Sequence, residues 1–515
     1  MHASATQPRF DADTVATGGR FHFSLSPNVY AGALLTMLAG LSVGFFAWYV
    51  IAVHRHLTPA SSSLLLVCLA VIGAIGAPSL WIIYSWAVSR ACGSDFYDVL
   101  HADAYSYIPL FGFWLSLFTM PGSPASASGL ISAVILLWIA IKVAALARFS
   151  TMVRSVATVF VATRIPLIII APLAGIVIGQ RQGHHWSAAH GILLDVWGRW
   201  DAQHYLAIAT LGYHGKDIAF FPLYPLLIHA LGGPIGDHLI AGLIISNAAF
   251  FVALAYLYAL VKLEFGDDAT AFHAIFYIAV FPTAIFFSAV YTESLFLALT
   301  VASVYYARRG NFISAGIFGA IASLTRVEGV LTALPLAYEA WHAWRERRGT
   351  TLARGLLGIA IVPAGLGAYM LYLYALVADP MYFMKIQDNW NRHLAPPWES
   401  VTNTLRQLSG HSLTSSFSVN LIIELVFTIA FLGLLVAAFG ALRPSYAWYF
   451  AASLLLPMST ASLMSMPRFV LVVFPAFILL ALWGRRPAVN SAIVSLSLPI
   501  LGLFTVLFAD WYWLA

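Results

Sequence analysis

Long apolar runs, separated by short polar segments, follow one another along most of the chain. A helix that crosses the roughly 30 Å hydrocarbon core of a bilayer needs about 20 mostly apolar residues. A first group of runs lies near residues 29 to 53, 62 to 89, 104 to 119 and 128 to 147. A second group lies near 236 to 262, 271 to 290, 293 to 307, 312 to 325, 329 to 343, 355 to 378, 420 to 441, 445 to 460, 469 to 483 and 488 to 509. The pattern predicts an all-α, polytopic transmembrane protein with about 12–15 spans.

A basic stretch and the first long polar excursion, residues 181 to 219, join the two groups. The basic stretch ends at Arg164 and precedes an apolar run, 165 to 178, that contains Pro166 and Pro172. Because a charged side chain inside a bilayer is costly, we expect Arg164 at the cytoplasmic end of this run, with residues 149 to 163 along the interface. The chain then divides into a cytoplasmic tail (1–28), an accessory N-terminal transmembrane region (29–155), a transmembrane core (156–485) and a C-terminal transmembrane segment (486–515).

Basic residues assign the loops to sides, since short cytoplasmic loops carry an excess of Lys and Arg. After residue 235, alternate loops hold the basic residues Lys262, Arg308, Arg309, Arg345, Arg347, Arg348, Arg354, Arg443, Arg485 and Arg486. The intervening loops are 181 to 219, 291 to 293, 325 to 328, 379 to 419 and 465 to 468, and they hold isolated charges beside aromatic residues and prolines. We therefore expect the second set, and any active site that it forms, on the extracytoplasmic side.

The composition agrees with a membrane protein and argues against a nucleic-acid-binding protein. Hydrophobic residues make up 61% of the chain and charged residues only 9%, against about 25% charged in soluble domains. The net charge of +5 is spread over short loops rather than gathered on one domain, so no nucleic-acid partner is expected.

The most specific motif lies in the first outer loop. Residues 200 to 213 read WDAQHYLAIATLGY, and residues 220 to 227 read FFPLYPLL. An interfacial aromatic belt would account for the aromatic residues alone. The whole pattern, however, resembles the PIG-V-like mannosyltransferases of the GT-C superfamily, whose members use polyprenyl-phosphate sugars. The resemblance covers roughly residues 160 to 485 and includes Tyr291-Thr292-Glu293, Leu324-Thr325-Arg326-Val327-Glu328, Gln387, Trp390, Pro467-Arg468-Phe469 and Phe474-Pro475.

The resemblance implies a GT-C-like catalytic core and an inverting glycosyl transfer, here of mannose, from a polyprenyl-phosphate donor to a lipid, protein or glycan acceptor. The position that matches the family's catalytic base is Asp201. A base has to take the proton of the attacking hydroxyl, whereas the lipid phosphate already leaves readily. Asp195 is the nearest rival, in a less specific context.

Further candidates are substrate-binding residues. Arg326 and Arg468 are expected at outer helix ends, where a cation can bind the leaving phosphate; the alternatives are snorkelling or an ion pair such as Arg326 with Glu328. Glu293 either holds sugar hydroxyls or only complements a helix dipole. Sugars are bound by amides and aromatic rings, and the remaining candidates are Trp200, His204, Tyr205, Gln387 and Trp390.

No metal or other cofactor is expected. His184, His185 and His190 cluster in the first outer loop, but no carboxylate or cysteine stands in register with them. Two other functions stay open at this point. A transporter or lipid flippase would also use broken helices and intramembrane charges, and a scaffold subunit would use the extra N-terminal spans for partner contact.

Overall fold

The structure is a computed structural model, and it describes residues 85, 150–178, 191–347 and 351–513. The predicted spans between residues 29 and 147, the cytoplasmic tail and the three histidines of the first outer loop lie outside the described residues.

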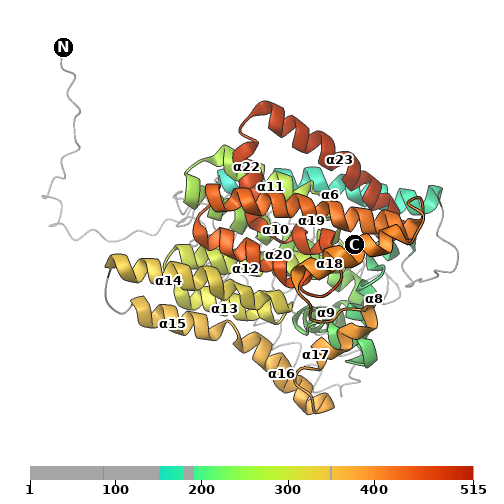
Figure 1. The fold of residues 1–515 in the computed structure, drawn as a ribbon, viewed down its shortest axis with the longest axis horizontal. Helices are drawn as coiled ribbons and strands as arrows, with labels where there is room; N and C mark the ends of the chain where they lie inside the picture. The colour runs from blue at the N-terminus through green and yellow to red at the C-terminus, as the bar shows by residue number, and fades with distance from the viewer. Residues whose placement is uncertain (1–84, 86–149, 179–190, 348–350, 514–515) are drawn as a thin grey trace, which may run out of the picture. The chain divides into compact units, whose positions relative to one another are not determined.

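The described residues form α-helices and short 3-10 helices, without strands (Figure 1). Five helical segments are long and apolar enough to cross a membrane: Thr151–Val177, His238–Phe265, Leu352–Val377, Ser416–Ala441 and Pro487–Ala509. The prediction of an all-α, polytopic membrane protein is therefore confirmed.

The helices are α6 (Thr151–Val177), α7 (Ile192–Asp195), η2 (Val196–Gly198), α8 (Ala202–Leu211), η3 (Gly215–Ala219), α9 (Leu223–Ile235), α10 (His238–Phe265), α11 (Asp268–Ala279), η4 (Ala284–Phe287), α12 (Glu293–Arg308), α13 (Phe312–Ser323), η5 (Val327–Thr332), α14 (Ala333–Arg347), α15 (Thr351–Ile361), α16 (Ala364–Val377), α17 (Tyr382–Lys385), η6 (Ile386–Trp390), α18 (Pro397–Ser409), α19 (Ser416–Ala441), α20 (Pro444–Met458), α21 (Met466–Leu471), α22 (Phe474–Trp483) and α23 (Pro487–Ala509).

Helix α10 is central to the packing and has well-defined ends. The side chain of Asp237 accepts a hydrogen bond from the backbone nitrogen of Ile240 at 3.0 Å, which caps the first turn. Gly266 ends the helix at φ 68°, a left-handed conformation that glycine adopts without strain. α10 packs against α9, α11 and α12, while α13, α14 and α15 form a neighbouring group (Figure 1). α12 joins the two groups.

The single span predicted for residues 271 to 290 is broken in the structure. α11 ends at Ala279, and residues 280 to 292 form irregular backbone that contains η4 and is buried throughout. Pro282 explains the break, because proline lacks the N–H of a helical hydrogen bond and its ring clashes with the preceding turn. Irregular backbone inside a bilayer is tolerated where protein surrounds it, as it does here.

Arg164 stabilises this break, which corrects two predictions. α6 is one continuous helix, so residues 151 to 163 do not form a separate interfacial segment, and Arg164 lies in its middle, buried, rather than at an end. Its guanidinium donates to the carbonyls of Ala279 at 2.6 Å and Ala284 at 2.8 Å, and to Ser288 Oγ at 3.2 Å. The charge is tolerated inside a span because it satisfies carbonyls that the broken helix leaves open.

Two clusters of charged side chains lie at opposite ends of α12, whose 16 residues correspond to a length of roughly 24 Å. At one end Arg308 pairs with Glu264 at 2.8 Å and with Glu339 at 3.2 Å, and Arg443 pairs with Glu339 at 2.7 Å. These arginines come from loops that the sequence assigned to one side of the membrane. The other cluster surrounds Glu293 and joins loops assigned to the opposite side.

Candidate active site

The loop before α8 is a tight turn held by the broken segment. Trp200 has φ 58°, an uncommon conformation for a residue with a side chain, and Asp201 follows as the residue before the first turn of α8. The backbone nitrogen of Val290 donates to the carbonyl of Trp197 at 3.1 Å, and the hydroxyl of Tyr291 donates to the carbonyl of Arg199 at 3.0 Å. The turn therefore fixes the direction of the Asp201 side chain.

Asp201 forms an ion pair through one of its two oxygens. Oδ2 accepts a hydrogen bond from Arg468 Nη1 at 2.6 Å. Oδ1 has no hydrogen-bond partner in the described part of the chain, and the carboxylate is 24% exposed. One oxygen is therefore oriented by a cation while the other is open to a ligand.

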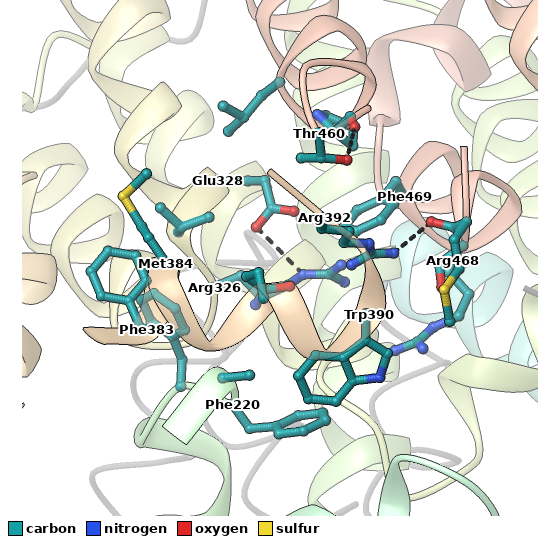
Figure 2. A pocket seen from close by; sticks show the side chains of 18 of the residues that line it. Phe220, Arg326, Glu328, Phe383, Met384, Trp390, Arg392, Thr460, Arg468 and Phe469 are labelled. Carbon is teal, nitrogen blue, oxygen red and sulfur yellow. Dashed lines mark hydrogen bonds and ion pairs between the residues drawn. The ribbon is translucent and has the colours of Figure 1, made fainter. Parts of the chain in front are cut away.

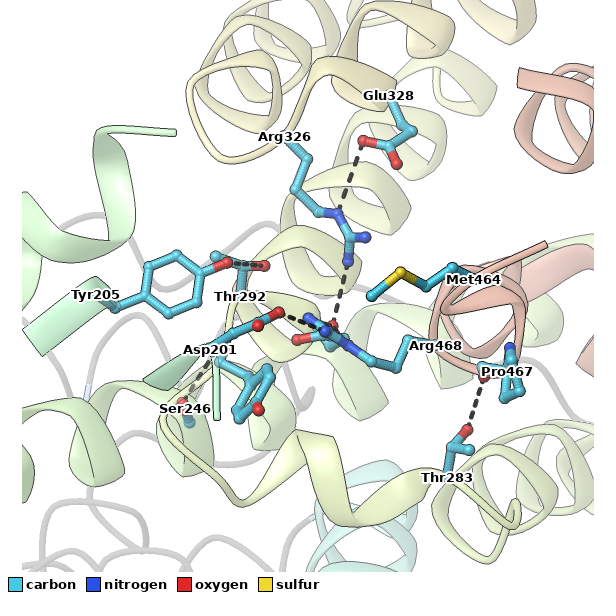
Figure 3. A network of polar contacts seen from close by, with 12 residues as sticks. Asp201, Tyr205, Ser246, Thr283, Thr292, Arg326, Glu328, Met464, Pro467 and Arg468 are labelled. Atoms are coloured by element: carbon cyan, nitrogen blue, oxygen red, sulfur yellow. Dashed lines mark hydrogen bonds and ion pairs between the residues drawn. The ribbon is translucent and has the colours of Figure 1, made fainter. Parts of the chain in front are cut away.

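The ion pair continues into a chain of alternating charges (Figure 3). Arg468 donates from Nε and Nη2 to Glu293 Oε1, both at 2.9 Å. Arg326 approaches the same oxygen with Nη1 at 3.4 Å, and its Nε lies 3.7 Å from Glu328 Oε2. Burial alone would lower the pKa of Arg468, but Glu293 and Asp201 raise it well above its ordinary value. Arg468 is thus permanently charged, and the ion pair of Arg326 with Glu328 weighed from the sequence is present.

A cavity of about 320 Å³ opens beside this chain of charges (Figure 2). It is formed by residues 201 to 221, the segment from Thr325 to Glu328, the loop after α17 and the segment before α21. The predicted site residues that line it are Asp201, Tyr205, Arg326, Gln387, Trp390 and Arg468. Segments far apart in the sequence therefore meet at one site, as expected from their assignment to one side.

Three predicted site residues lie behind the cavity wall instead. Glu293 is fully buried and contacts the arginines. His204 pairs with Asp217 at 2.7 Å and stacks on Phe220 with ring centroids 4.5 Å apart. Trp200 packs against Trp511 and Trp513, with ring centroids 5.6 Å and 5.3 Å away. Each of the three contacts a residue that lines the cavity.

Asp195, the rival base, is buried in α7 and does not line the cavity. Burial away from the cavity separates it from any acceptor that occupies the site. Of the two candidate bases, Asp201 lines the cavity and Asp195 does not.

Arg392 and Trp513 line the cavity, and sequence reasoning did not assign either to the site. Trp513 packs against Trp200 with ring centroids 5.3 Å apart and lies 5.9 Å from the guanidinium of Arg468. An isolated arginine in an expected outer loop is the same signal that singled out Arg326 and Arg468, so it could have found Arg392. The packing of Trp513 on a residue 313 positions earlier carried no local signal.

The cavity is charged at one part and apolar at another. Leu394, Met384, Leu456 and Pro457 contribute apolar lining. Leu394 is 82% exposed and Met384 is 45% exposed at the surface. A ligand with an ionic head and a hydrocarbon tail matches this division. No group of three or more potential metal-ligating side chains occurs within the ranges that the structure describes.

The fold and the site first define a class: an integral membrane protein of apolar helices whose inter-helix loops enclose an acidic and arginine-rich cavity. Comparison with known sequences shows what part of the chain is similar to: residues 184–387 match the model of the family described as mannosyltransferase (PIG-V). The resemblance to the PIG-V-like mannosyltransferases is therefore confirmed across that segment.

Individual relatives agree with the family match. GPI alpha-1,6-mannosyltransferase 2 of Cricetulus griseus is 32% identical over 151 residues, which are 27% of this chain and 31% of that protein. GPI mannosyltransferase 2 of Cryptococcus neoformans is 27% identical over 151 residues, covering 27% of this chain and 35% of the relative. The protein of that name from Schizosaccharomyces pombe is 28% identical over 138 residues, covering 26% and 30%. The chain matches about a third of the length of these curated relatives.

Proposed function

We propose that this protein is an inverting mannosyltransferase that takes mannose from a polyprenyl-phosphate donor and transfers it to a hydroxyl group on the extracytoplasmic face. The observation that carries the proposal is the position of Asp201: one carboxylate oxygen is held by Arg468 and the other is open, in a cavity that is charged at one part and apolar at another. The family match over residues 184–387 supports mannose as the sugar that is transferred.

In the proposed reaction, Asp201 acts as general base. The acceptor oxygen attacks the anomeric carbon of the donor sugar and forms the new glycosidic bond, while its proton passes to the open oxygen of Asp201. The bond between the anomeric carbon and the phosphate oxygen breaks, and the electron pair leaves with the lipid phosphate. A single displacement inverts the anomeric carbon. A positioned base of this kind contributes about 10²–10⁴-fold to the rate.

The proposal extends to both substrates. An exposed apolar part of the cavity, near Leu394 and Met384, suits the hydrocarbon chain of the donor. The names of the relatives refer to GPI, a glycolipid, so a lipid-anchored glycan is the acceptor class to test first, before a protein or a free glycan. No metal is part of the proposal, because a monophosphate leaving group carries less charge than a diphosphate and arginines can neutralise it.

The test is a transfer assay with purified protein, polyprenyl-phosphate mannose and candidate acceptors. Asp201→Asn should lower kcat by about 10²–10⁴-fold and leave the protein folded. Asp379→Asn is the matched control, because Asp379 belongs to another outer loop, pairs with Lys385 at 2.6 Å and does not line the cavity. Unchanged turnover in Asp201→Asn would remove Asp201 as base. Accumulation of donor in vesicles without covalent transfer would support transport instead.

A further inference from the structure

Within the described part of the chain, three arginines line the cavity, and two of them already pair with carboxylates. Arg468 lies between Asp201 and Glu293, and Arg326 lies between Glu293 and Glu328. An anion that bound to either would compete with carboxylates for the same guanidinium groups. These two residues, chosen from the sequence as phosphate ligands, are therefore poorly available.

Arg392 is different. Its Nη2 donates to the carbonyl of Met464 at 2.6 Å, and its guanidinium lies 5.5 Å from the centre of the Phe469 ring. Its Nε is buried without a hydrogen-bond partner, and the described residues include no carboxylate in an ion pair with it. Figure 2 shows its guanidinium in the pocket with those of Arg326 and Arg468.

The backbone around Arg392 is arranged to present this side chain. η6 ends at Trp390, and Asn391 follows with φ 53°, a left-handed conformation that asparagine adopts more readily than most residues. The backbone nitrogen of Arg392 then donates to the carbonyl of Gln387 at 3.2 Å, and that of Ala395 donates to Ser459 at 3.0 Å. The turn is anchored on both sides, so the arginine is held in the cavity by main-chain contacts.

Electrostatics give this position an affinity for anions. Burial and, to a smaller extent, the charge of the neighbouring Arg468 lower the pKa of Arg392 to about 10, while Asp201, Glu424 and Glu328 act in the opposite direction. The guanidinium still carries its charge at neutral pH. Arg392 is partly buried, and a charge withdrawn from water without a direct counter-ion is unfavourable. An anionic ligand would remove that penalty.

We propose that Arg392 binds the phosphate group of the lipid-linked donor and of the lipid phosphate that remains after transfer. The assignment rests on the proposed function for the identity of the ligand. Two residues further along, Leu394 lines the cavity and is largely exposed, so the hydrocarbon chain can leave the site beside the bound phosphate. Negative charge grows on the phosphate as the glycosidic bond breaks, and a nearby guanidinium stabilises it in the transition state.

The test measures binding without turnover. Purified protein in detergent is titrated with polyprenyl phosphate, with neutral polyprenol of the same length, with inorganic phosphate and with mannose 1-phosphate. Binding is read from the ligand-induced rise in thermal unfolding temperature. Variants are Arg392→Gln, Arg392→Lys and the control Arg406→Gln, an exposed residue whose guanidinium bonds only to Asn403 among the described residues.

Arg392→Gln should weaken polyprenyl phosphate binding by about 10- to 100-fold, the range expected when a hydrogen bond to a charged group is lost. Polyprenol binding should not change. Arg392→Lys should keep part of the affinity, because it retains the charge and loses the planar fork. Without ligand, Arg392→Gln should be as stable as the unmodified protein or more stable, whereas a purely structural role would make it less stable.

Each alternative result has a definite meaning. Equal binding of polyprenyl phosphate by Arg392→Gln and the unmodified protein would overturn the assignment. Inorganic phosphate or mannose 1-phosphate that binds as tightly as the lipid would overturn a lipid donor. Arg392-dependent lipid phosphate binding without any mannosyl transfer would support the site while refuting the proposed function. Transfer that needs Asp201 but not Arg392 would refute the site alone.

Discussion

Replacement of Arg468 by glutamine tests the chain of charges most directly. The change leaves two carboxylates without their shared cation, and they differ in burial: Glu293 is fully buried, whereas Asp201 is 24% exposed. Removing one member of a buried pair costs about 3–5 kcal/mol, and exposed pairs contribute about 0–1 kcal/mol. Arg468→Gln should therefore lower the free energy of unfolding by about 3 kcal/mol, the lower end of this range, because Arg326 Nη1 still lies 3.4 Å from Glu293 Oε1.

The change at the partner residue, Glu293→Gln, should lower the free energy of unfolding less than Arg468→Gln does. Glu293→Gln removes the buried charge and leaves Arg468 paired with Asp201, and Arg326 paired with Glu328. The double variant Arg468→Gln/Glu293→Gln has no unpaired buried carboxylate at this position. It should be more stable than the sum of the two single changes predicts, by about 1–3 kcal/mol of coupling.

Reversible unfolding in mixed micelles, measured for all four proteins of the cycle, gives this coupling energy. Arg406→Gln serves as a control for the loss of an exposed arginine and should change stability by less than about 0.5 kcal/mol. If the losses of the two single variants simply add in the double variant, Arg468 and Glu293 are not coupled and the reasoning fails.

Three other changes probe the frame of the site. Arg164→Leu leaves the carbonyls of the broken segment unsatisfied and should cost about 1–3 kcal/mol for each group lost, measured by the same unfolding assay; unchanged stability would contradict the capping role. Gly329→Ala places a Cβ against the backbone nitrogen of Ser323 and should destabilise by about 1–3 kcal/mol, so an unaffected unfolding midpoint would count against this close packing. Trp513→Ala should lower kcat while having a smaller effect on the free energy of unfolding, because Trp513 contacts Trp200 and Arg468. Turnover equal to that of the control Trp398→Ala, a change at an exposed residue, would argue against this role.

The sequence predicts the helices well where apolar composition decides the structure. The runs expected at 236 to 262, 420 to 441 and 488 to 509 correspond to α10, α19 and α23, with shifts of a few residues at their ends. The break after α11 was missed because residues 280 to 292 are as apolar as the helices around them, and Pro282 was the only local sign of it. Apolar composition indicates that a segment is buried. It does not show whether the buried segment is a helix or irregular backbone.

The position of Arg164 was not predicted correctly by the general rules of membrane insertion. Such rules describe a charge facing lipid, whereas this side chain bonds to carbonyls 115 and 120 residues further along the chain. Its partner is a backbone feature that exists only after folding. No pattern around residue 164 could have indicated it.

For the candidate site, the sequence predicted several of the residues but not how their charges pair. Motif resemblance and the distribution of basic loops singled out Asp201, Arg326 and Arg468, and these side chains do meet. The sequence could not show how the charges pair, because the ion pair between Asp201 and Arg468 joins residues 267 positions apart. The local pair of Arg326 with Glu328 was visible as an alternative because the two residues are neighbours in the sequence.

The pairing of charges separates two tasks that one arginine would otherwise have to combine. If Arg468 held the donor phosphate, the phosphate would compete with Asp201 for the guanidinium, and donor binding would disturb the orientation of the proposed base. Arg392 stands outside the chain of ion pairs, so an anion can bind there while Asp201 keeps its contact with Arg468. The two arginines should then give different kinetic signatures. Arg468→Lys should lower kcat with a small effect on the KM for donor, Arg392→Lys should mainly raise that KM, and identical signatures would show that one residue serves both tasks.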